Sequence, residues 1–240
     1  MLDKYISILV YYLETDPIGE SLTLYFSLKM KFNSLISTHQ LLRTQVYDYL
    51  REELKKENLK PGMFISINQI VENSGISRTP LRDALLQLQN EGFVTFLPQR
   101  GIRINELTQQ DIEDNYEMLG ALDSRILLSV FDRIGAPEIE AMKRLNQELG
   151  TNLAGKKFGL YWDLNTAFHH IYLDLSSNAP ILKQLNIIRQ RLFEFGKKDW
   201  SLKMKKLNYS EHLTIIELIQ KGRAIEAADF MRDVHCAINF

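Results

Sequence analysis

Hydrophobic residues recur every three or four positions over much of the chain, which is the spacing of amphipathic helices. From Thr108 onward this pattern predicts roughly six or seven helices and scarcely any strand. Thr108, with Asp111 three residues later, predicts the start of the first helix, and Pro137 suits the first turn of the second. Gly222 predicts the break before the last helix. The later helices are expected at about Phe158–Leu175, Pro180–Phe195, Asp199–Gln220 and Ala224–Ile238.

The segment from residue 41 to residue 105 has a different pattern. An apolar face from Leu42 to Leu54 predicts one helix, which Pro61-Gly62 closes. Two short helices are expected next, at about 67–73 and 78–91. Two runs rich in β-branched and aromatic residues then flank a turn that contains Gly101, and they predict a β-hairpin over 93–104. Three helices followed by a hairpin are typical of a winged helix-turn-helix.

The sequence therefore predicts a mostly α protein, in which an N-terminal winged helix-turn-helix with a small β-hairpin precedes a C-terminal all-α helical bundle. We expect a helical extension over residues 1–40, the winged domain over 41–105 and the helical domain over 106–240. The extension holds apolar stretches at Leu2–Leu13 and Leu22–Ile36, which predict an arm that packs on the body or on a partner subunit. A second hypothesis is that translation starts at Met30.

Composition narrows the class of protein. With 45% hydrophobic and 25% charged residues, the 240-residue chain is ordinary globular material rather than a disordered or low-complexity protein. Its single cysteine, Cys236, excludes an internal disulfide framework and fits a reducing compartment. The longest largely apolar stretch, Ile6–Leu13, is far shorter than the about 20 residues that span a bilayer. We expect a cytoplasmic protein with no membrane association.

Net charge does not settle whether the chain binds nucleic acid. The formal charge is −1, and residues 41–105 carry nine Lys and Arg against seven Asp and Glu. An excess of two positive charges decides nothing, so the case depends on where individual arginines lie.

Two arginines stand where a helix-turn-helix reads DNA. The second helix of such a motif enters the major groove with its N-terminal residues first. Here Arg78 and Arg82 lie four residues apart and therefore share one helix face. Cations at a helix N-terminus oppose the helix dipole, a cost that makes sense where phosphates or guanine edges face them. Ser77 and Thr79 can cap this helix and donate to phosphates, while Arg100 and the flexible Gly101 form a wing tip suited to insertion along the backbone or into the minor groove.

The same residues resemble a known family. Pro61-Gly62, the run from Gly75 to Leu85, Glu91-Gly92-Phe93-Val94 and Pro98-Gln99-Arg100-Gly101 look like the N-terminal domain of GntR-type transcriptional regulators. The family usually has Glu where this chain has Ile67, and a charged residue that often approaches DNA where it has Asn68. The resemblance implies DNA contacts from Asn68, Ser77, Arg78, Thr79, Arg82, Arg100 and Gly101.

Four of the five histidines lie in the helical domain. Asn165 and His169 are four residues apart on one helix, while His212 and His235 belong to the last two helices. Three imidazoles and one oxygen ligand make a plausible mononuclear metal site, although this spacing alone is a weak signal. His170 points about 100° away from His169 and is not expected to be a ligand.

These residues, together with Ser177-Asn178, Gly222 and Met231, resemble the FCD effector-binding domain of FadR-like GntR regulators. The resemblance implies a divalent metal (Zn, Ni or Mn) held by Asn165, His169, His212 and His235. Two features depart from the family: Asn165 replaces the more usual Asp, and His235 follows Met231 by four residues rather than three. The extra residue rotates His235 by about 100° on an ideal helix, so a local shift of that helix is needed to deliver it.

The resemblance also implies a small-molecule effector, a carboxylate or sugar acid. The family commonly pairs such an effector with an Arg on the first helix of this domain, where this chain has Leu119, and Asp123 matches a usual Glu. Leucine cannot form that bidentate pair, which leaves two alternatives: an effector that binds mainly through the metal, or one that is not a simple organic acid. Arg125 and Arg189 are the nearest candidate replacements.

We interpret the chain as a homodimeric transcriptional regulator, a repressor, that binds a palindromic double-stranded operator and responds to an effector. One alternative is a metal-dependent hydrolase built on the histidine cluster, which needs an open coordination position and a nearby general base. Another is a DNA-binding protein whose bundle holds no metal and only dimerises.

Overall fold

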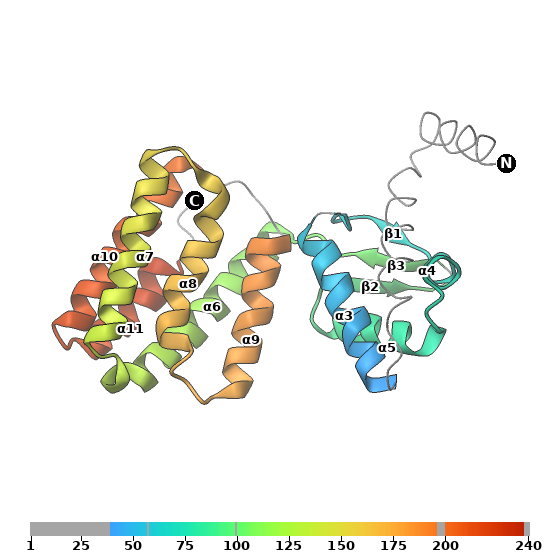
Figure 1. The fold of residues 1–240 in the computed structure, drawn as a ribbon, viewed down its shortest axis with the longest axis horizontal. Helices are drawn as coiled ribbons and strands as arrows, with labels where there is room; N and C mark the ends of the chain where they lie inside the picture. The colour runs from blue at the N-terminus through green and yellow to red at the C-terminus, as the bar shows by residue number, and fades with distance from the viewer. Residues whose placement is uncertain (1–38, 57, 99, 196–199, 238–240) are drawn as a thin grey trace. The chain divides into compact units, whose positions relative to one another are not determined.

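The computed structural model describes residues 39–56, 58–98, 100–195 and 200–237. The chain divides into two compact units, with the boundary between Glu106 and Leu107 (Figure 1). Residues 1–38 lie outside the described residues. They include nearly all of the extension expected over residues 1–40 and the alternative start at Met30.

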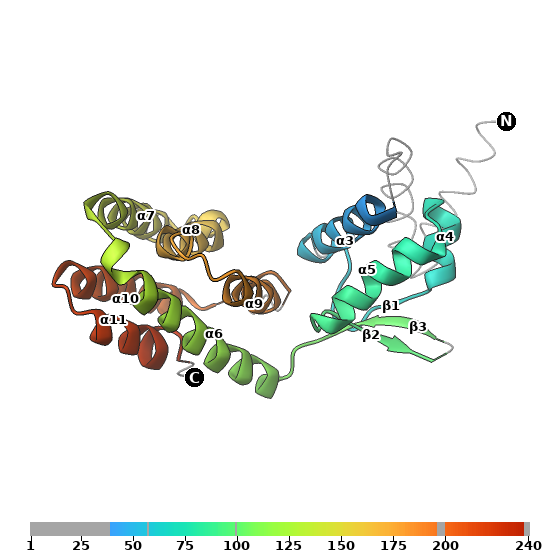
Figure 2. The same ribbon diagram turned by 90° about the horizontal axis from the view of Figure 1, so that it is seen from below.

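The N-terminal unit holds three helices and a small sheet. A two-residue strand that sequence reasoning missed, β1, joins the expected hairpin, and all pairing is antiparallel in the order β1-β3-β2. The helices α3 and α5 pack together and lie over one side of this sheet (Figure 2). The elements are α3 (His39–Lys55), β1 (Phe64–Ile65), α4 (Ile67–Ser74), α5 (Arg78–Asn90), β2 (Val94–Leu97) and β3 (Gly101–Ile104).

Local signals set the ends of α4. The Ser66 hydroxyl accepts a hydrogen bond from the Gln69 amide at its start, and Gly75 at its end has φ +70°, a backbone conformation that glycine adopts without strain. The next helix, α5, buries one face of Leu81, Ala84, Leu85 and Leu88 against the core. The predicted winged helix-turn-helix is confirmed.

The C-terminal unit is entirely helical in its described part. The Asp111 amide donates to the Thr108 hydroxyl at 3.1 Å and the Thr108 amide donates to the Asp111 carboxylate at 2.9 Å, which is the capping box expected at the first helix. Pro137 lies in the first turn of the second helix, and Gly222 follows the helix before the last with φ +68°. The α-helices are α6 (Gln109–Val130), α7 (Ala136–Ala154), α8 (Tyr161–Leu173), α9 (Ala179–Arg189), α10 (Leu202–Gln220) and α11 (Ala224–Phe230).

The first of these helices, α6, is the centre of the unit. It contacts α8, α9, α11 and the turn that follows α11. Ile126 and Leu127 of α6 pack in a core with Phe168, Tyr172 and Met231, all completely or almost completely buried. None of the described helices has the length and apolar character that a membrane crossing needs.

Two of the expected helices do not remain α-helical to their ends. The helix predicted over 180–195 becomes a π-helix, η3 (Gln190–Phe195), and the helix predicted over 224–238 becomes a π-helix, η4 (Met231–His235). In η4 the Cys236 amide donates to the Met231 carbonyl, five residues back, at 3.0 Å. A π-turn accommodates one residue more than an α-turn, so the direction of His235 differs from that on an ideal helix.

Gly101 at the wing provides a test of this fold. Its φ is +91°, and a Cβ there would lie 2.4 Å from the Ile65 carbonyl oxygen, whereas Gly62 has φ +81° and open space around it. Both alanine variants carry left-handed strain of about 1–2 kcal/mol. We expect Gly101→Ala to lose about 1–3 kcal/mol more than Gly62→Ala in urea denaturation of the full-length protein, because β1 must move. Equal losses would show that the close approach of β1 and β3 is unimportant.

Candidate functional site

The N-terminus of α5 presents two cations to solvent, and neither forms an ion pair within the described part of the chain. Arg78 and Arg82 are both exposed, and no acidic residue lies in the first turn of the helix. On the opposite face Leu81, Leu85 and Leu88 are almost completely buried. The packing of one face therefore determines that the arginines project outward, as a DNA-reading helix requires.

Asn68 and Ser77 lie next to these arginines, and only Asn68 makes a side-chain hydrogen bond there. The Arg78 guanidinium donates to the Asn68 side-chain oxygen at 3.2 Å, so Asn68 lies beside the reading face although its residue type departs from the family pattern. Ser77 occupies the N-cap position, but its side chain makes no capping hydrogen bond. The expected cap is wrong, and the exposed Ser77 and Thr79 hydroxyls remain at the helix N-terminus.

The wing tip carries the exposed Arg100. Gly101 was expected to provide flexibility there, yet it is paired with Leu97 in the hairpin and packs against the backbone of β1. The structure thus gives Gly101 a steric role within the sheet.

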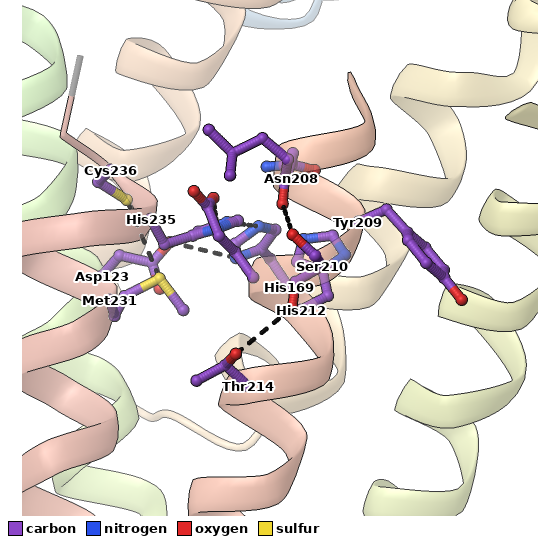
Figure 3. Close-up of polar contacts among 12 residues, drawn as sticks. Asp123, His169, Asn208, Tyr209, Ser210, His212, Thr214, Met231, His235 and Cys236 are labelled. Atoms are coloured by element: carbon purple, nitrogen blue, oxygen red, sulfur yellow. Dashed lines mark hydrogen bonds and ion pairs between the residues drawn. The ribbon is translucent and has the colours of Figure 1, made fainter. Parts of the chain in front are cut away.

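In the helical domain the sequence-predicted histidines come together. His169 of α8, His212 of α10 and His235 of η4 are buried, and their ligand atoms lie within 4.8 Å of one another (Figure 3). Asn165, one turn before His169, is also buried. The exposed His170 instead pairs with Asp174 on the surface of α8, as its predicted direction requires.

Each histidine uses its outer nitrogen to hold a partner. His169 Nδ1 lies 2.8 Å from the Tyr172 hydroxyl. His212 Nδ1 lies 3.0 Å from the Asn146 amide oxygen. His235 Nδ1 lies 3.0 Å from a Glu211 carboxylate oxygen. The Asn146 amide nitrogen donates to the Tyr209 carbonyl, so its oxygen accepts from His212. Glu211 accepts from His235 in the same way.

Tyr172 determines that the proton of His169 is on Nδ1. Burial raises the pKa of Tyr172, so its phenol keeps its proton, which it donates to Asp123. The phenol oxygen then accepts from His169 Nδ1. All three imidazoles consequently carry the Nδ1 proton and direct an Nε2 lone pair inward, the arrangement that outer hydrogen bonds produce around a bound metal.

The inner donor atoms lack partners of their own among the described residues. His212 Nε2 and the Asn165 side-chain oxygen are buried without a hydrogen bond, and His169 Nε2 and His235 Nε2 face each other at 3.2 Å. Two lone pairs at that distance repel, and a cation between them removes the repulsion. Two nitrogens bound to one zinc ion with tetrahedral geometry lie about 3.3 Å apart. The donor set therefore fits a divalent metal.

Burial keeps two of these donors neutral. Removal from water lowers the pKa of His169 and of His212 well below the usual value, and the charge of Arg189 adds to the effect. A neutral imidazole is the form that binds a metal. His212 is further oriented by Phe168, whose ring stacks on it at a centroid distance of 3.8 Å.

The π-turn of η4 explains how His235 reaches the cluster despite its displaced position in the sequence. It absorbs the additional residue between Met231 and His235. The turn also packs closely on α6, since a Cβ on Gly120 would lie 3.0 Å from both the Arg232 carbonyl oxygen and the Cys236 Cβ. Gly120 therefore permits the approach of η4 that places His235.

The cavity beside the cluster has a largely apolar wall. Its lining includes Leu119, at the position where the family resemblance implies an Arg, and three aromatic residues, Tyr116, Phe193 and Trp200. Arg189 also lines it, but one terminal nitrogen of its guanidinium is bound to the buried Asp123, and its Nε is buried without a partner among the described residues. Arg125 is exposed on α6 and does not line the cavity. Arg125 is therefore not placed to bind an effector in this cavity, and Arg189 already forms an ion pair with Asp123.

Several supporting residues were missed from the sequence. Asn146, Tyr172 and Glu211 hold the three imidazoles, and Arg189 was considered only as an effector ligand. No local spacing links these residues to the histidines they support, apart from Tyr172 three residues after His169. The one available signal in the sequence for such supporting residues was a polar residue at a position on an apolar helix face.

Known proteins resemble both units. The profile described as "Bacterial regulatory proteins, gntR family" matches residues 42–104, and that of the FCD domain matches residues 114–235, half of the chain. This chain belongs to the GntR family. It is a DNA-binding transcriptional regulator with an FCD effector-binding domain.

Relatives of this GntR regulator carry the same type of name. The Nta operon transcriptional regulator of Aminobacter aminovorans is 28% identical over 72% of this chain and 81% of its own length. The transcriptional repressor GlaR of Escherichia coli is 22% identical over 78% of this chain and 89% of its own.

Among solved structures, E. coli McbR/YncC superposes with a TM-score of 0.60 at 14% identity, covering 82% of this chain and 95% of that one. A putative GntR regulator from Rhodococcus sp. RHA1 also gives 0.60 at 17% identity, covering 79% and 91%. These two likenesses confirm the fold.

The hydrolase interpretation is not supported, because members of this GntR family are DNA-binding regulators rather than enzymes. The carboxylate next to His212 is also engaged, since Glu211 accepts a hydrogen bond from His235 Nδ1 and is not placed as a general base.

Gly120→Ala tests the positioning of His235. Alanine favours a helix interior by about 1 kcal/mol, but here the added methyl group must push η4 away. We expect zinc affinity to fall about ten- to a hundredfold, as when the outer supports of a ligand are lost. Competitive zinc titration of the full-length protein measures this. Gly159→Ala, in open space, is the control and should bind zinc as the unmodified protein does. A more stable Gly120→Ala variant with unchanged zinc affinity would contradict the assignment.

Proposed function

We propose that this regulator is a homodimeric repressor that binds a two-fold-symmetric operator through α5 and the wing. A symmetric dimer matches a palindromic site, with one α5 in the major groove of each half-site. The observation that carries the proposal is the exposed pair Arg78 and Arg82 at the start of a helix whose other face is buried. A protein that acts on genomic DNA in this way works in the cytoplasm.

Each DNA contact has a chemical role. Arg82 and Arg78 suit guanine edges or phosphates, and Asn68, beside Arg78, suits an adenine edge or a phosphate. Ser77 and Thr79 donate to phosphates at the helix N-terminus, where the dipole favours an anion. Arg100 reaches the backbone or the minor groove from the wing tip, which Gly101 shapes.

The helical domain holds a divalent metal through Asn165, His169, His212 and His235. The orphaned Asn165 oxygen and His212 Nε2 support this proposal over a metal-free dimerisation domain. Of zinc, nickel and manganese, three imidazoles and one amide oxygen favour zinc or nickel, since manganese prefers oxygen-rich sites. When bound, the metal supplies a Lewis-acidic centre that joins α8, α10 and η4. A ligand of this domain changes operator affinity only as far as it prefers one of two states of the protein.

The recognition helix is tested by Arg82→Ala. Sequences selected by the purified protein from random duplexes provide the operator. If Arg82 reads a guanine, the variant loses about 1–3 kcal/mol of specific binding and its preference at that base pair. If it contacts only phosphate, all sequences weaken alike and the salt dependence becomes shallower.

Fluorescence anisotropy against salt concentration separates these outcomes. Arg144→Ala, an exposed arginine of α7, removes the same charge from the helical domain and should leave operator affinity within about twofold. If Arg82→Ala matches Arg144→Ala in affinity, specificity and salt slope, α5 is not the reading helix.

Metal analysis tests the proposal that the helical domain holds a divalent metal. Protein purified without chelator or nickel resin should hold close to one zinc or nickel ion per chain, and His169→Ala should lose most of it because a ligand is missing. His170→Ala, one residue away and exposed, should keep the metal. Substoichiometric metal that His169→Ala does not reduce would favour the metal-free interpretation.

A further inference from the structure

The cavity at the histidine cluster is too small for an organic effector. Its volume is about 20 Å³. One water molecule needs about 10–15 Å³ by the same kind of measure, whereas pockets for organic ligands are about 300–1,000 Å³. The cavity therefore accommodates a metal ion with a bound water molecule, and a sugar acid would have to displace the walls.

The walls are not arranged to recognise an acid either. Tyr116, Phe193 and Trp200 form an aromatic side, in which Phe193 and Trp200 are 6.4 Å apart between ring centroids and Tyr116 contacts Phe193 edge to face. Leu119 adds an apolar surface. The positive charge of Arg189 is already neutralised by Asp123, so a carboxylate entering here would have to compete with a buried ion pair.

A larger hollow elsewhere in the unit offers no better site. It has a volume of about 380 Å³ and lies on the surface between α7 and α8. Its polar lining is occupied within the chain, since His170 pairs with Asp174 and Glu138 accepts from the Gly135 amide. These carboxylates would also repel an acidic ligand.

Two of the three histidines are mechanically connected to α6, the helix that follows the boundary between the units. His169 is linked through Tyr172 to Asp123 of α6. His235 lies in η4, whose backbone packs on Gly120 of α6. An ion that draws α8, α10 and η4 together thus acts on α6 at two points.

From this geometry we propose that the divalent metal ion is itself the regulatory ligand, so that operator affinity follows occupancy of the histidine cluster. This inference rests on the proposed function, because it requires both DNA binding and metal binding by the same chain. It replaces the carboxylate or sugar acid that the family resemblance implies with an inorganic effector.

The experiment measures operator affinity of the full-length protein stripped of metal with a chelator that is then removed. Anisotropy titrations with the selected duplex are run without metal, with zinc, with nickel and with magnesium as a control cation. We expect zinc or nickel alone to change the Kd about tenfold or more, within the usual range of allosteric coupling, and magnesium to have no effect. Acetate and gluconate, which bind zinc only weakly, should change the Kd of the metal-loaded protein less than twofold when they are added in the presence of excess zinc.

Thermodynamic reciprocity supplies an independent measurement. If metal changes DNA affinity by a given factor, the operator must change zinc affinity by the same factor. Zinc titrations with and without the duplex therefore test the proposal in the unmodified protein, with no dependence on a variant that folds poorly. His169→Ala, checked for helicity by circular dichroism, should have an operator affinity that zinc does not change, whereas the affinity of His170→Ala should respond to zinc as that of the unmodified protein does.

The outcomes are distinguishable. Specific DNA binding that is insensitive to zinc and nickel, or that changes only when an organic acid joins the metal, overturns this inference and leaves the proposed function intact. Absence of specific DNA binding in every metal state overturns the proposed function itself.

Discussion

The buried carboxylate of Asp123 is the constraint around which the helical domain is built. It is fully enclosed, and a charge in that position is tolerated only when partners neutralise it and satisfy its oxygens. Arg189 of α9 and the Tyr172 hydroxyl of α8 do so, which joins three helices at one point. Because Tyr172 must donate to Asp123, it must accept from His169, and the tautomer of that histidine follows. The hydrogen bonds that stabilise the buried charge of Asp123 therefore also orient His169.

The same domain shows how a change in chain register is absorbed. A helix with one additional residue before its ligand would turn that ligand away by about 100°. Here the additional residue is taken up by η4, and the absence of a side chain at Gly120 lets the widened turn approach α6. Asn146 of α7 orients the imidazole of His212, and Glu211 of α10 orients that of His235. The histidines come from separate elements, but their orientations are set jointly.

Much of this architecture could be predicted because its signals are local. The capping box at Thr108, Pro137 in a first turn, Gly222 after a helix and the buried face of α5 each involve residues within a few positions of one another. The strand β1 was missed since two residues carry no periodicity. The π-turns were missed because a one-residue change in winding leaves no mark on an apolar pattern. The pairings of His212 with Asn146 and of Asp123 with Arg189 join residues 66 positions apart, and no local rule relates them.

The aromatic side of the cavity has a consequence for spectroscopy. One of the chain's two tryptophans, Trp200, lines it, and the other, Trp162, packs behind it: the indole of Trp162 stacks on Phe193 at 4.8 Å between ring centroids and meets that of Trp200 edge to face at 5.1 Å. Tryptophan emission from this protein therefore originates in a single neighbourhood, beside the cavity that His169 and His235 also line. The molecule contains its own optical gauge of that region, free of background from the DNA-reading unit, and needs no attached dye.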